Sequence, residues 1–366
     1  MRTTIIPYAA VVADYAQVKQ KQDTSHPTSR SQRFNTAHHT RLDMLPAIRE
    51  SATFTHSPPP WTPYGYVLWQ PLVARSQKLV DARVVRIPGF LLEDLMRCHA
   101  ASVSTNAIPA GLIQEVVAMW RSTGKGRKLE GILDGEKEWF IRLDQMSPKD
   151  SPFGGKEATR SFDDVVRKMC SSMRAWNALQ NEVFDAKAQE RELRINLILN
   201  PWDASMTAAN EFRCFVPPPA ARGAAPHVDN LRLSAVSHYA WHHAFTHPFQ
   251  FSAHKTADAV VSGATFLLQE IQSFLSNMPL EIKMLLLRHG FTFDLALQPD
   301  ATVHLVEINP FGALSGCGAC LFHWVRDARV LYGFFEDVEF RITAGRMCAQ
   351  YCCWGCEVVC GCESGG

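Results

Sequence analysis

The sequence has almost no net charge, no long apolar run and no internal repeat. Its 37 lysine and arginine residues are balanced by 36 aspartate and glutamate residues, which leaves a formal charge of +1 at pH 7. This balance argues against a broad nucleic-acid surface, because phosphate binding needs a basic excess. No apolar stretch approaches the roughly 18 residues that span a bilayer. No period of about 20–50 residues recurs, which excludes a repeat protein.

Cysteine is scarce in most of the chain and unevenly placed. Of the 11 cysteines, only Cys98, Cys170, Cys214, Cys317 and Cys320 precede residue 348, and the rest crowd the end of the chain. This spacing does not indicate the even disulfide framework of a small secreted protein. The first residues carry one basic side chain and a short apolar run broken by proline, so no signal peptide is predicted. We therefore expect a soluble, cytoplasmic protein in a reducing compartment.

The composition indicates a folded body between two tails. Apolar residues make up 46% of the chain and charged residues 20%, which excludes full disorder. Residues 1–60 are predicted to be a disordered leader, because much of this stretch is polar without a period and it closes on three prolines. Residues 346–366 are predicted to be a disordered, cysteine-rich tail, and residues 61–345 are expected to form the folded domain.

Hydrophobic periodicity predicts alternating helices and strands within the folded body. Helices are expected over 111–122 and 264–276, and a third is expected to begin after an N-cap at Ser161. Strands are expected over 138–143, 193–200, 211–216, 233–239, 291–297 and 302–310. The order of these elements predicts an α+β fold with a mostly antiparallel sheet.

The last two predicted strands carry the sharpest chemical signal. Glu307 and Asn309 are two residues apart, so they point to the same face of a strand, and Val303 and Leu305 are expected to share that face. A hairpin at residues 298–301 would bring Asp294 across from Glu307. Three hard oxygen donors in one small volume suit Mg²⁺. The alternative is that these are ordinary strand-end acids bonded to turn amides.

Several segments resemble the cell division cycle protein 123 family. EFRCFV (Glu211–Val216) and INPFG (Ile308–Gly312) occur in the family's order, and FIRLDQMSPKD (Phe140–Asp150) is similar to a third family segment. VLWQPL and VVRIPGFLLEDL, further upstream, are similar to two more. The resemblance spans residues 65–324, which is most of the folded chain.

This resemblance implies an ATP-grasp-like fold in which two lobes with antiparallel sheets hold a nucleotide between them. The lobes are expected over about 61–180 and 181–345, with ATP and Mg²⁺ as cofactors. Asp294, Glu307 and Asn309 match the family's magnesium ligands.

The other predicted nucleotide-binding residues also come from the resemblance. Arg142 and Arg213 match cationic phosphate contacts, and Glu211 lies on the same strand face as Arg213. The predicted phosphate-side loop contains Asp144, Ser147 and Asp150. Adenine recognition is expected from backbone atoms around Leu199, Asn200 and Trp202.

The chain departs from the family pattern in ways that bear on affinity. Asn200 and Pro201 replace a basic pair in the hinge, and proline removes one N–H donor. His238 and Tyr239 replace another charged pair. These changes indicate a divergent member.

The implied function is an ATP- and magnesium-dependent assembly factor. It would bind the gamma subunit of translation initiation factor two, be linked to cell-cycle progression, act as a monomer without catalytic residues, and contact neither nucleic acid nor membrane. A carboxylate–amine ligase of the ATP-grasp type and a degenerate module without nucleotide are the alternatives.

Histidine and cysteine clusters offer a metal-binding interpretation that we do not favour. Cys317 and Cys320 lack a second pair at ribbon-like spacing, and the terminal cysteines lie beyond the family match. Four further side chains are expected on the surface: His238, His242, His243 and His247.

Overall fold

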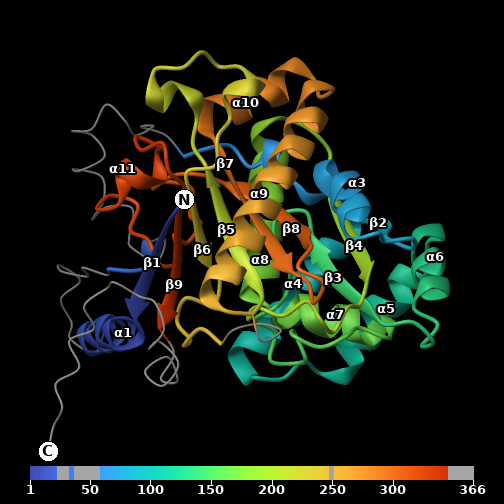
Figure 1. Ribbon diagram of the computed structural model, residues 1–366. Coiled ribbons are helices and arrows are strands. Elements are labelled where there is room, and N and C mark those ends of the chain that lie inside the picture. The colour runs from blue at the N-terminus through green and yellow to red at the C-terminus, as the bar shows by residue number, and fades with distance from the viewer. Residues whose placement is uncertain (23–32, 37–57, 247–250, 345–366) are drawn as a thin grey trace, which may run out of the picture.

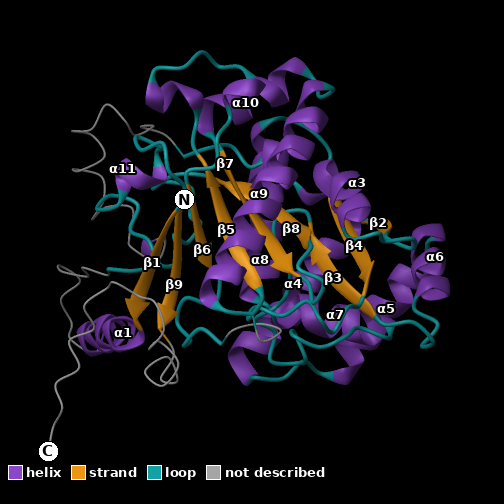
Figure 2. Ribbon diagram, viewed as in Figure 1, coloured by secondary structure: helices purple, strands orange, loops and turns teal. Residues whose placement is uncertain are grey.

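The structure is a computed structural model that describes residues 1–22, 33–36, 58–246 and 251–344 (Figure 1). It is a mixed α+β fold built on two sheets, as Figure 2 shows. The predicted tail at 346–366, the terminal cysteines and His247 lie outside the described residues.

The larger sheet has six strands in the order β1-β9-β6-β5-β7-β8. Its strands are β1 (Arg2–Pro7), β5 (Glu211–Val216), β6 (Ala235–His238), β7 (Phe291–Leu297), β8 (Val303–Pro310) and β9 (Glu339–Ala344). β9 pairs in parallel with β1 and β6, and the remaining pairs are antiparallel. The expectation of a mostly antiparallel sheet is therefore confirmed.

One face of this sheet is apolar because alternate residues of β5 and β7 are large hydrophobes. Phe212, Phe291, Phe293 and Leu295 are fully buried there. They pack with residues of α9 (Ala253–Ser276) and α10 (Leu280–His289) in one core. In Figure 1, α9 lies across the strands on this face. α9 begins earlier than the predicted helix over 264–276, after an N-cap at Ser252.

The smaller sheet has three antiparallel strands in the order β2-β4-β3. They are β2 (Arg83–Ile87), β4 (Ile195–Pro201) and β3 (Trp139–Leu143). Helices cover one face: α4 (Leu92–Thr105), α5 (Ala110–Ser122), α6 (Gly124–Ile132), α7 (Phe162–Ser171) and α8 (Met173–Ala188). The predicted helix over 111–122 is α5, and the predicted cap is a capping box of Ser161 and Asp164 at the start of α7.

The lobe boundary expected near residue 180 does not match the strand pairing. β4 lies after that boundary, yet it is the central strand of the smaller sheet. The reason is that β4 hydrogen-bonds to β2 and β3 on its two sides, and this pairing is decided by tertiary contacts.

The prediction that residues 1–60 form a disordered leader is wrong for the part that the structure describes. β1 pairs with β9 along its whole length, and α1 (Tyr8–Gln22) follows it directly. Ile6 and Val11 are buried in a small cluster with Phe34 and Leu321. This apolar burial stabilises the N-terminal segment on the larger sheet.

A bulge in β8 changes which residues share the face of Glu307. Asp294 pairs with Glu307, but the next residue, Leu295, pairs with Leu305, so Val306 is an extra residue. Leu305 therefore lies on the apolar face, fully buried in the core. The expectation that Val303 and Leu305 share the face of Glu307 is wrong, because it assumed unbroken alternation.

α3 (Tyr66–Ser76) packs against β8, where the hydroxyl of Ser76 accepts from the Leu305 amide at 2.8 Å and Gln77 donates to the Leu305 carbonyl at 2.6 Å. A short helix, α11 (Ala328–Leu331), precedes β9. Among the described residues, no helix combines the length and apolarity that a membrane crossing requires.

Candidate functional site

Charged side chains gather on the polar face of the larger sheet, where it meets the smaller one. Strand alternation places Glu211 and Arg213 of β5 on this face. Register pairs Arg213 with Asp294 of β7, and Asp294 with Glu307 of β8. The predicted juxtaposition of Asp294 and Glu307 is thus present in the structure. β3 of the smaller sheet lies beside β8 in Figure 2.

Arg213 and Asp294 form a buried, two-pronged ion pair. Nε of Arg213 donates to Oδ1 of Asp294 and Nη2 donates to Oδ2, both at 2.8 Å. The third nitrogen, Nη1, donates to the Gly318 carbonyl at 2.8 Å. The guanidinium is thereby held by all three of its nitrogens.

Arg142 reaches across from the smaller sheet to Glu307. Its Nη1 donates to Oε2 of Glu307 at 2.8 Å, and its guanidinium lies 4.0 Å from the ring centre of Tyr66. Asn309 lies between the two carboxylates, because its Nδ2 is 3.2 Å from Oδ2 of Asp294 and 3.1 Å from Oε1 of Glu307. The three predicted magnesium ligands therefore share one small volume.

Electrostatics at Glu307 favour the ionised carboxylate. Burial by itself would raise the pKa of Glu307, but Arg142 and Lys149 outweigh it and hold this pKa well below its usual range. An ionised carboxylate beside an amide is a suitable ligand for a hard divalent cation.

At Glu211, in contrast, the surroundings favour the protonated carboxyl group. Its side chain is buried, and within the described part of the chain no hydrogen bond or ion pair to its carboxyl group is present. Burial raises its pKa to about 7, and the neighbouring Asp294 and Glu307 add to the rise. Lys149 and Arg213 act against it. Glu211 is thus a carboxyl group close to its titration point at neutral pH.

Sequence reasoning did not single out two aromatic residues and a lysine at this site. Lys149 and Arg213 both lie over the ring of Tyr239, at 5.9 and 5.1 Å from its centre. Tyr66 lies under Arg142 in the same way. The signal for Lys149 was its place in the segment Phe140–Asp150. We use the name charge cluster for seven side chains together: Arg142, Lys149, Glu211, Arg213, Asp294, Glu307 and Asn309.

Two residues of the predicted phosphate-side loop, Asp144 and Asp150, hold neighbouring elements together. The carboxylate of Asp144 accepts from the Val67 amide at 3.0 Å and from Nδ2 of Asn196 at 2.8 Å, which joins the start of α3 to β4. Asp150 accepts from the Ser172 hydroxyl and from the Arg174 amide, at the start of α8. The role of Asp144 and Asp150 at phosphate stays a prediction.

Ser147 is buried in the same loop, and its carbonyl accepts from Nε of Arg174 at 3.0 Å. This contact ties the loop to α8. A phosphate contact from Ser147 also stays a prediction.

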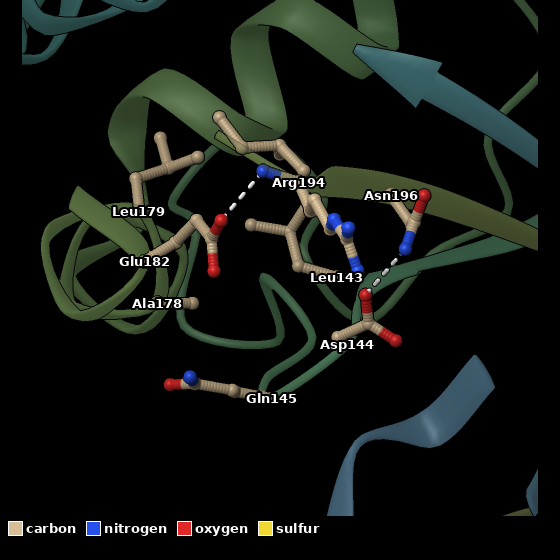
Figure 3. A pocket seen from close by; sticks show the side chains of 9 residues that line it. Leu143, Asp144, Gln145, Ala178, Leu179, Glu182, Arg194 and Asn196 are labelled. Carbon is tan, nitrogen blue, oxygen red and sulfur yellow. Dashed lines mark hydrogen bonds between the residues drawn. The ribbon is translucent and has the colours of Figure 1, made fainter. Parts of the chain in front are cut away.

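A small pocket of about 50 Å³ adjoins Asp144 (Figure 3). Asn196 points toward Asp144 there, and Glu182 accepts from the Arg194 amide at 2.5 Å. Nucleotide-sized pockets are typically several hundred Å³, so this pocket is too small for ATP. Its polar groups are joined to one another.

The groups of the predicted adenine-binding segment are mostly occupied by contacts within the protein. Leu199 points into the core, and its neighbours in the sheet are Arg83 and Ile141. The Trp202 amide already donates to the Glu138 carbonyl at 2.9 Å. Asn200 is buried, and its Nδ2 donates to the Tyr66 hydroxyl at 2.7 Å, while its Oδ1 has no hydrogen-bond partner among the described residues.

The surface prediction for the histidines is wrong for His238. His238 is only 2% exposed, because it lies on the apolar face of the larger sheet. Its Nε2 lies 3.0 Å from the Ala209 carbonyl. Burial lowers its pKa to about 4. His242 and His243 are exposed, as predicted.

The metal-binding interpretation of Cys317 and Cys320, which the sequence did not favour, gains no support from the pKa values of the two thiols. Burial raises the pKa of Cys317 to about 11 and that of Cys320 to about 12, which disfavours the thiolate form that binds metals. Across the described ranges, no group of three or more His, Cys, Asp or Glu residues is placed to hold a metal ion. For a magnesium ion held by Asp294 and Glu307 at the charge cluster, the predicted third protein ligand would be the amide oxygen of Asn309.

No family model and no curated protein matches this sequence. Among solved structures, Cdc123 from Schizosaccharomyces pombe is similar, with a TM-score of 0.51 and 21% identity over 78% of this chain and 96% of that one. A C-terminally truncated form of the same protein gives a TM-score of 0.52 at the same identity and coverage. The chain has a divergent, Cdc123-like fold.

The Cdc123-like fold confirms the resemblance that the sequence segments indicated. At 21% identity, the similarity establishes the mixed α+β architecture and leaves ligands and partners to be proposed.

Proposed function

We propose that this Cdc123-like chain binds ATP and Mg²⁺ between its two sheets and acts in the cytoplasm, as a monomer, in assembling the translation initiation factor two complex. The partner would be the gamma subunit of that factor, and the link to cell-cycle progression follows from the same resemblance. The observation that carries the proposal is the charge cluster, in which cationic side chains from both sheets meet carboxylates at the sheet junction.

The residues present fit a metal–nucleotide pair. Arg142, Arg213 and Lys149 would contact phosphate oxygens, and Asp294, Glu307 and Asn309 would hold the metal. Asn309 already contacts both carboxylates, and turning its amide would present its oxygen to the same place. The metal would supply charge neutralisation between the carboxylates and the phosphates.

The two ion pairs predict that metal and nucleotide bind together. In the structure each guanidinium is neutralised by a carboxylate: Arg142 by Glu307, and Arg213 by Asp294. A metal ion alone would compete for the carboxylates and leave two buried guanidinium groups without a counter-charge. Phosphate alone would compete for the guanidinium groups and leave the two buried carboxylates without a counter-charge. Because an unpaired buried charge is costly, the two ligands should enhance each other's affinity.

Bound nucleotide would also connect the two sheets. Arg142 belongs to β3 and Arg213 to β5, so a triphosphate that contacts both would favour one relative arrangement of the sheets. This arrangement would determine the surface presented to a partner, without any chemical step.

A degenerate binding module is the second candidate. Pro201 lacks an N–H, and the Trp202 N–H is already bonded to Glu138, so two expected backbone donors for adenine are missing. The ligase alternative has no such observation in its favour, since no set of side chains in the sequence was identified that would hold an acid and an amine.

The test is a calorimetric titration of ATP into the full chain, with Mg²⁺ and with EDTA. Saturable binding that requires Mg²⁺ and is lost in Glu307→Gln supports the proposal. A matched control is Glu182→Gln, since Glu182 is also a glutamate paired with arginine but lies on α8. The absence of binding in a folded sample favours the degenerate module. ATP-dependent capture of the isolated gamma subunit then tests the partner, and turnover of ATP with an acid and an amine would favour the ligase.

A further inference from the structure

The loop at residues 311–327, which follows β8, completes the environment of Arg213. The carbonyl of Gly318 in this loop accepts a hydrogen bond from Nη1 of Arg213, the guanidinium nitrogen that does not donate to Asp294. The orientation of Arg213 thus depends on where the loop holds that carbonyl. We call residues 311–327 the Gly318 loop and residues 33–36 the arm.

The arm holds the Gly318 loop by backbone and side-chain hydrogen bonds. The Asn35 amide donates to the carbonyls of Cys320 at 2.8 Å and Phe322 at 3.2 Å, and its Oδ1 accepts from the Cys320 amide at 3.2 Å. The Thr36 hydroxyl accepts from the Trp324 amide at 3.0 Å. Asn35 and Thr36 are buried, so these bonds are shielded from water.

An ion-pair network anchors the outer end of the same loop. Asp327 accepts from both Arg33 of the arm and Arg341 of β9, with distances from 2.7 to 3.2 Å. The arm therefore contacts the loop at both ends of the segment that contains Cys320 and Trp324.

Asn35 and Gly318 are also fitted to each other sterically. A Cβ atom added to Gly318 would lie 1.9 Å from Oδ1 of Asn35, and the three nearest atoms all belong to the Asn35 side chain. Asn35 itself has a φ of +49°, a left-handed conformation that asparagine adopts more readily than most residues. A side chain at position 318 therefore requires the Asn35 side chain to move.

We propose that Asn35 is a positioning residue of the nucleotide site, which fixes the Gly318 carbonyl and through it the guanidinium of Arg213. The inference rests on the proposed function. It assigns the N-terminal arm a role in nucleotide affinity, although the arm lies far from the charge cluster in the sequence.

The test measures Mg²⁺·ATP affinity in the full chain. Asn35→Ala should weaken binding about tenfold, because a hydrogen bond to a charged group is misplaced. The matched control is Asn106→Ala, since Asn106 also has a left-handed φ, +55°, but ends α4 on the surface. Asn106→Ala should leave affinity unchanged.

Two double variants separate positioning from general stability. In an Arg213→Lys background, Asn35→Ala should cause no further loss, since a single ammonium group cannot bridge Asp294 and Gly318 as the guanidinium does. Gly318→Ala should weaken binding more than Asn35→Ala, and the pair Asn35→Ala/Gly318→Ala should return to the level of Asn35→Ala alone because the colliding amide is absent.

The outcomes distinguish this inference from the proposed function. A folded wild type that does not bind Mg²⁺·ATP overturns the proposed function, and the positioning role fails with it. A wild type that binds, together with an unchanged Asn35→Ala variant, overturns the positioning role alone. Strictly multiplicative losses in the Arg213→Lys background would also overturn it, because Asn35 would then act independently of Arg213.

Discussion

Arg213 and Asp294 lie directly opposite each other on β5 and β7, and their side chains form a two-pronged ion pair in which both groups are almost fully buried. Taking two charges out of water is costly, and the mutual attraction of a buried pair repays this cost only with good geometry. Such a pair contributes little net stability, yet removal of one partner is strongly destabilising. Net stability is therefore a poor explanation for this pair, and the proposed nucleotide site offers another.

This pair gives a first prediction. Asp294→Leu alone should lower the free energy of unfolding by about 3–5 kcal/mol, because Arg213 is left buried without a counter-charge. The double variant Arg213→Met/Asp294→Leu should recover most of that loss and still not bind Mg²⁺·ATP. Urea unfolding and calorimetry measure the two quantities. A double variant that binds nucleotide would remove both residues from the site.

Glu307→Gln is expected to abolish Mg²⁺-dependent nucleotide binding while the fold is largely retained. The amide keeps the shape of the side chain but loses the charge that attracts the metal and pairs with Arg142. Calorimetric titration measures affinity, and circular dichroism checks the fold. Unchanged affinity would show that Glu307 is not a metal ligand.

The stability of the protein should depend on pH through Glu211. Burial raises the pKa of this carboxyl from 4.5 to about 7, so its neutral form is favoured in the folded state. The contribution of Glu211 to the free energy of unfolding is on the order of 3 kcal/mol. It is fully present below about pH 4.5 and is lost as the pH rises through about 7.

The variant Glu211→Gln does not titrate, so its free energy of unfolding should fall less than that of the wild type between about pH 5 and pH 8. Urea unfolding at several pH values measures this difference. Glu115→Gln, at an exposed position on α5, is the control and should follow the wild-type profile. Parallel curves for Glu211→Gln and the wild type would contradict the burial argument.

Adjacent isoleucines of β1 test whether the N-terminal strand is part of the folded protein. Ile6 is 9% exposed and Ile5 is 44% exposed, because successive residues of a strand point to opposite faces. Ile6→Ser should lower the free energy of unfolding by about 2–3 kcal/mol, and Ile5→Ser should change it by less than about 0.5 kcal/mol. Equal effects in thermal denaturation would favour the disordered leader predicted from composition.

Much of the local structure was predictable, because it depends on neighbouring residues. The alternation in Glu211–Val216 and the turn at 298–301 correctly predicted β5, β7 and β8, and with them the meeting of Asp294 and Glu307. The capping residues at Ser161 correctly predicted the start of α7. In each case the deciding contacts lie within a short stretch of the chain.

Other features depended on contacts between distant segments. Nothing local in β1 indicates that β9 would be its partner at the far end of the described chain, and the bulge at Val306 is defined only by its pairing with β7. Lys149 joined the site because its loop brings it over Tyr239, which follows a strand of the larger sheet.

The sequence by itself determined the strands β3 to β8 and the acid and amide that β8 carries, because side-chain alternation is a local property of the backbone. It did not determine the faces of Val303 and Leu305, which depend on the bulge at Val306. The tertiary structure alone decided which charges neutralise each other. Arg142 meets Glu307 only because the two sheets lie against each other. Asn35 lies at the Gly318 loop where its neighbour Phe34 packs in one cluster with Ile6 of β1 and Leu321 of the loop. Ion pairs and loop contacts of this kind follow from the packing of whole elements, which no short segment specifies.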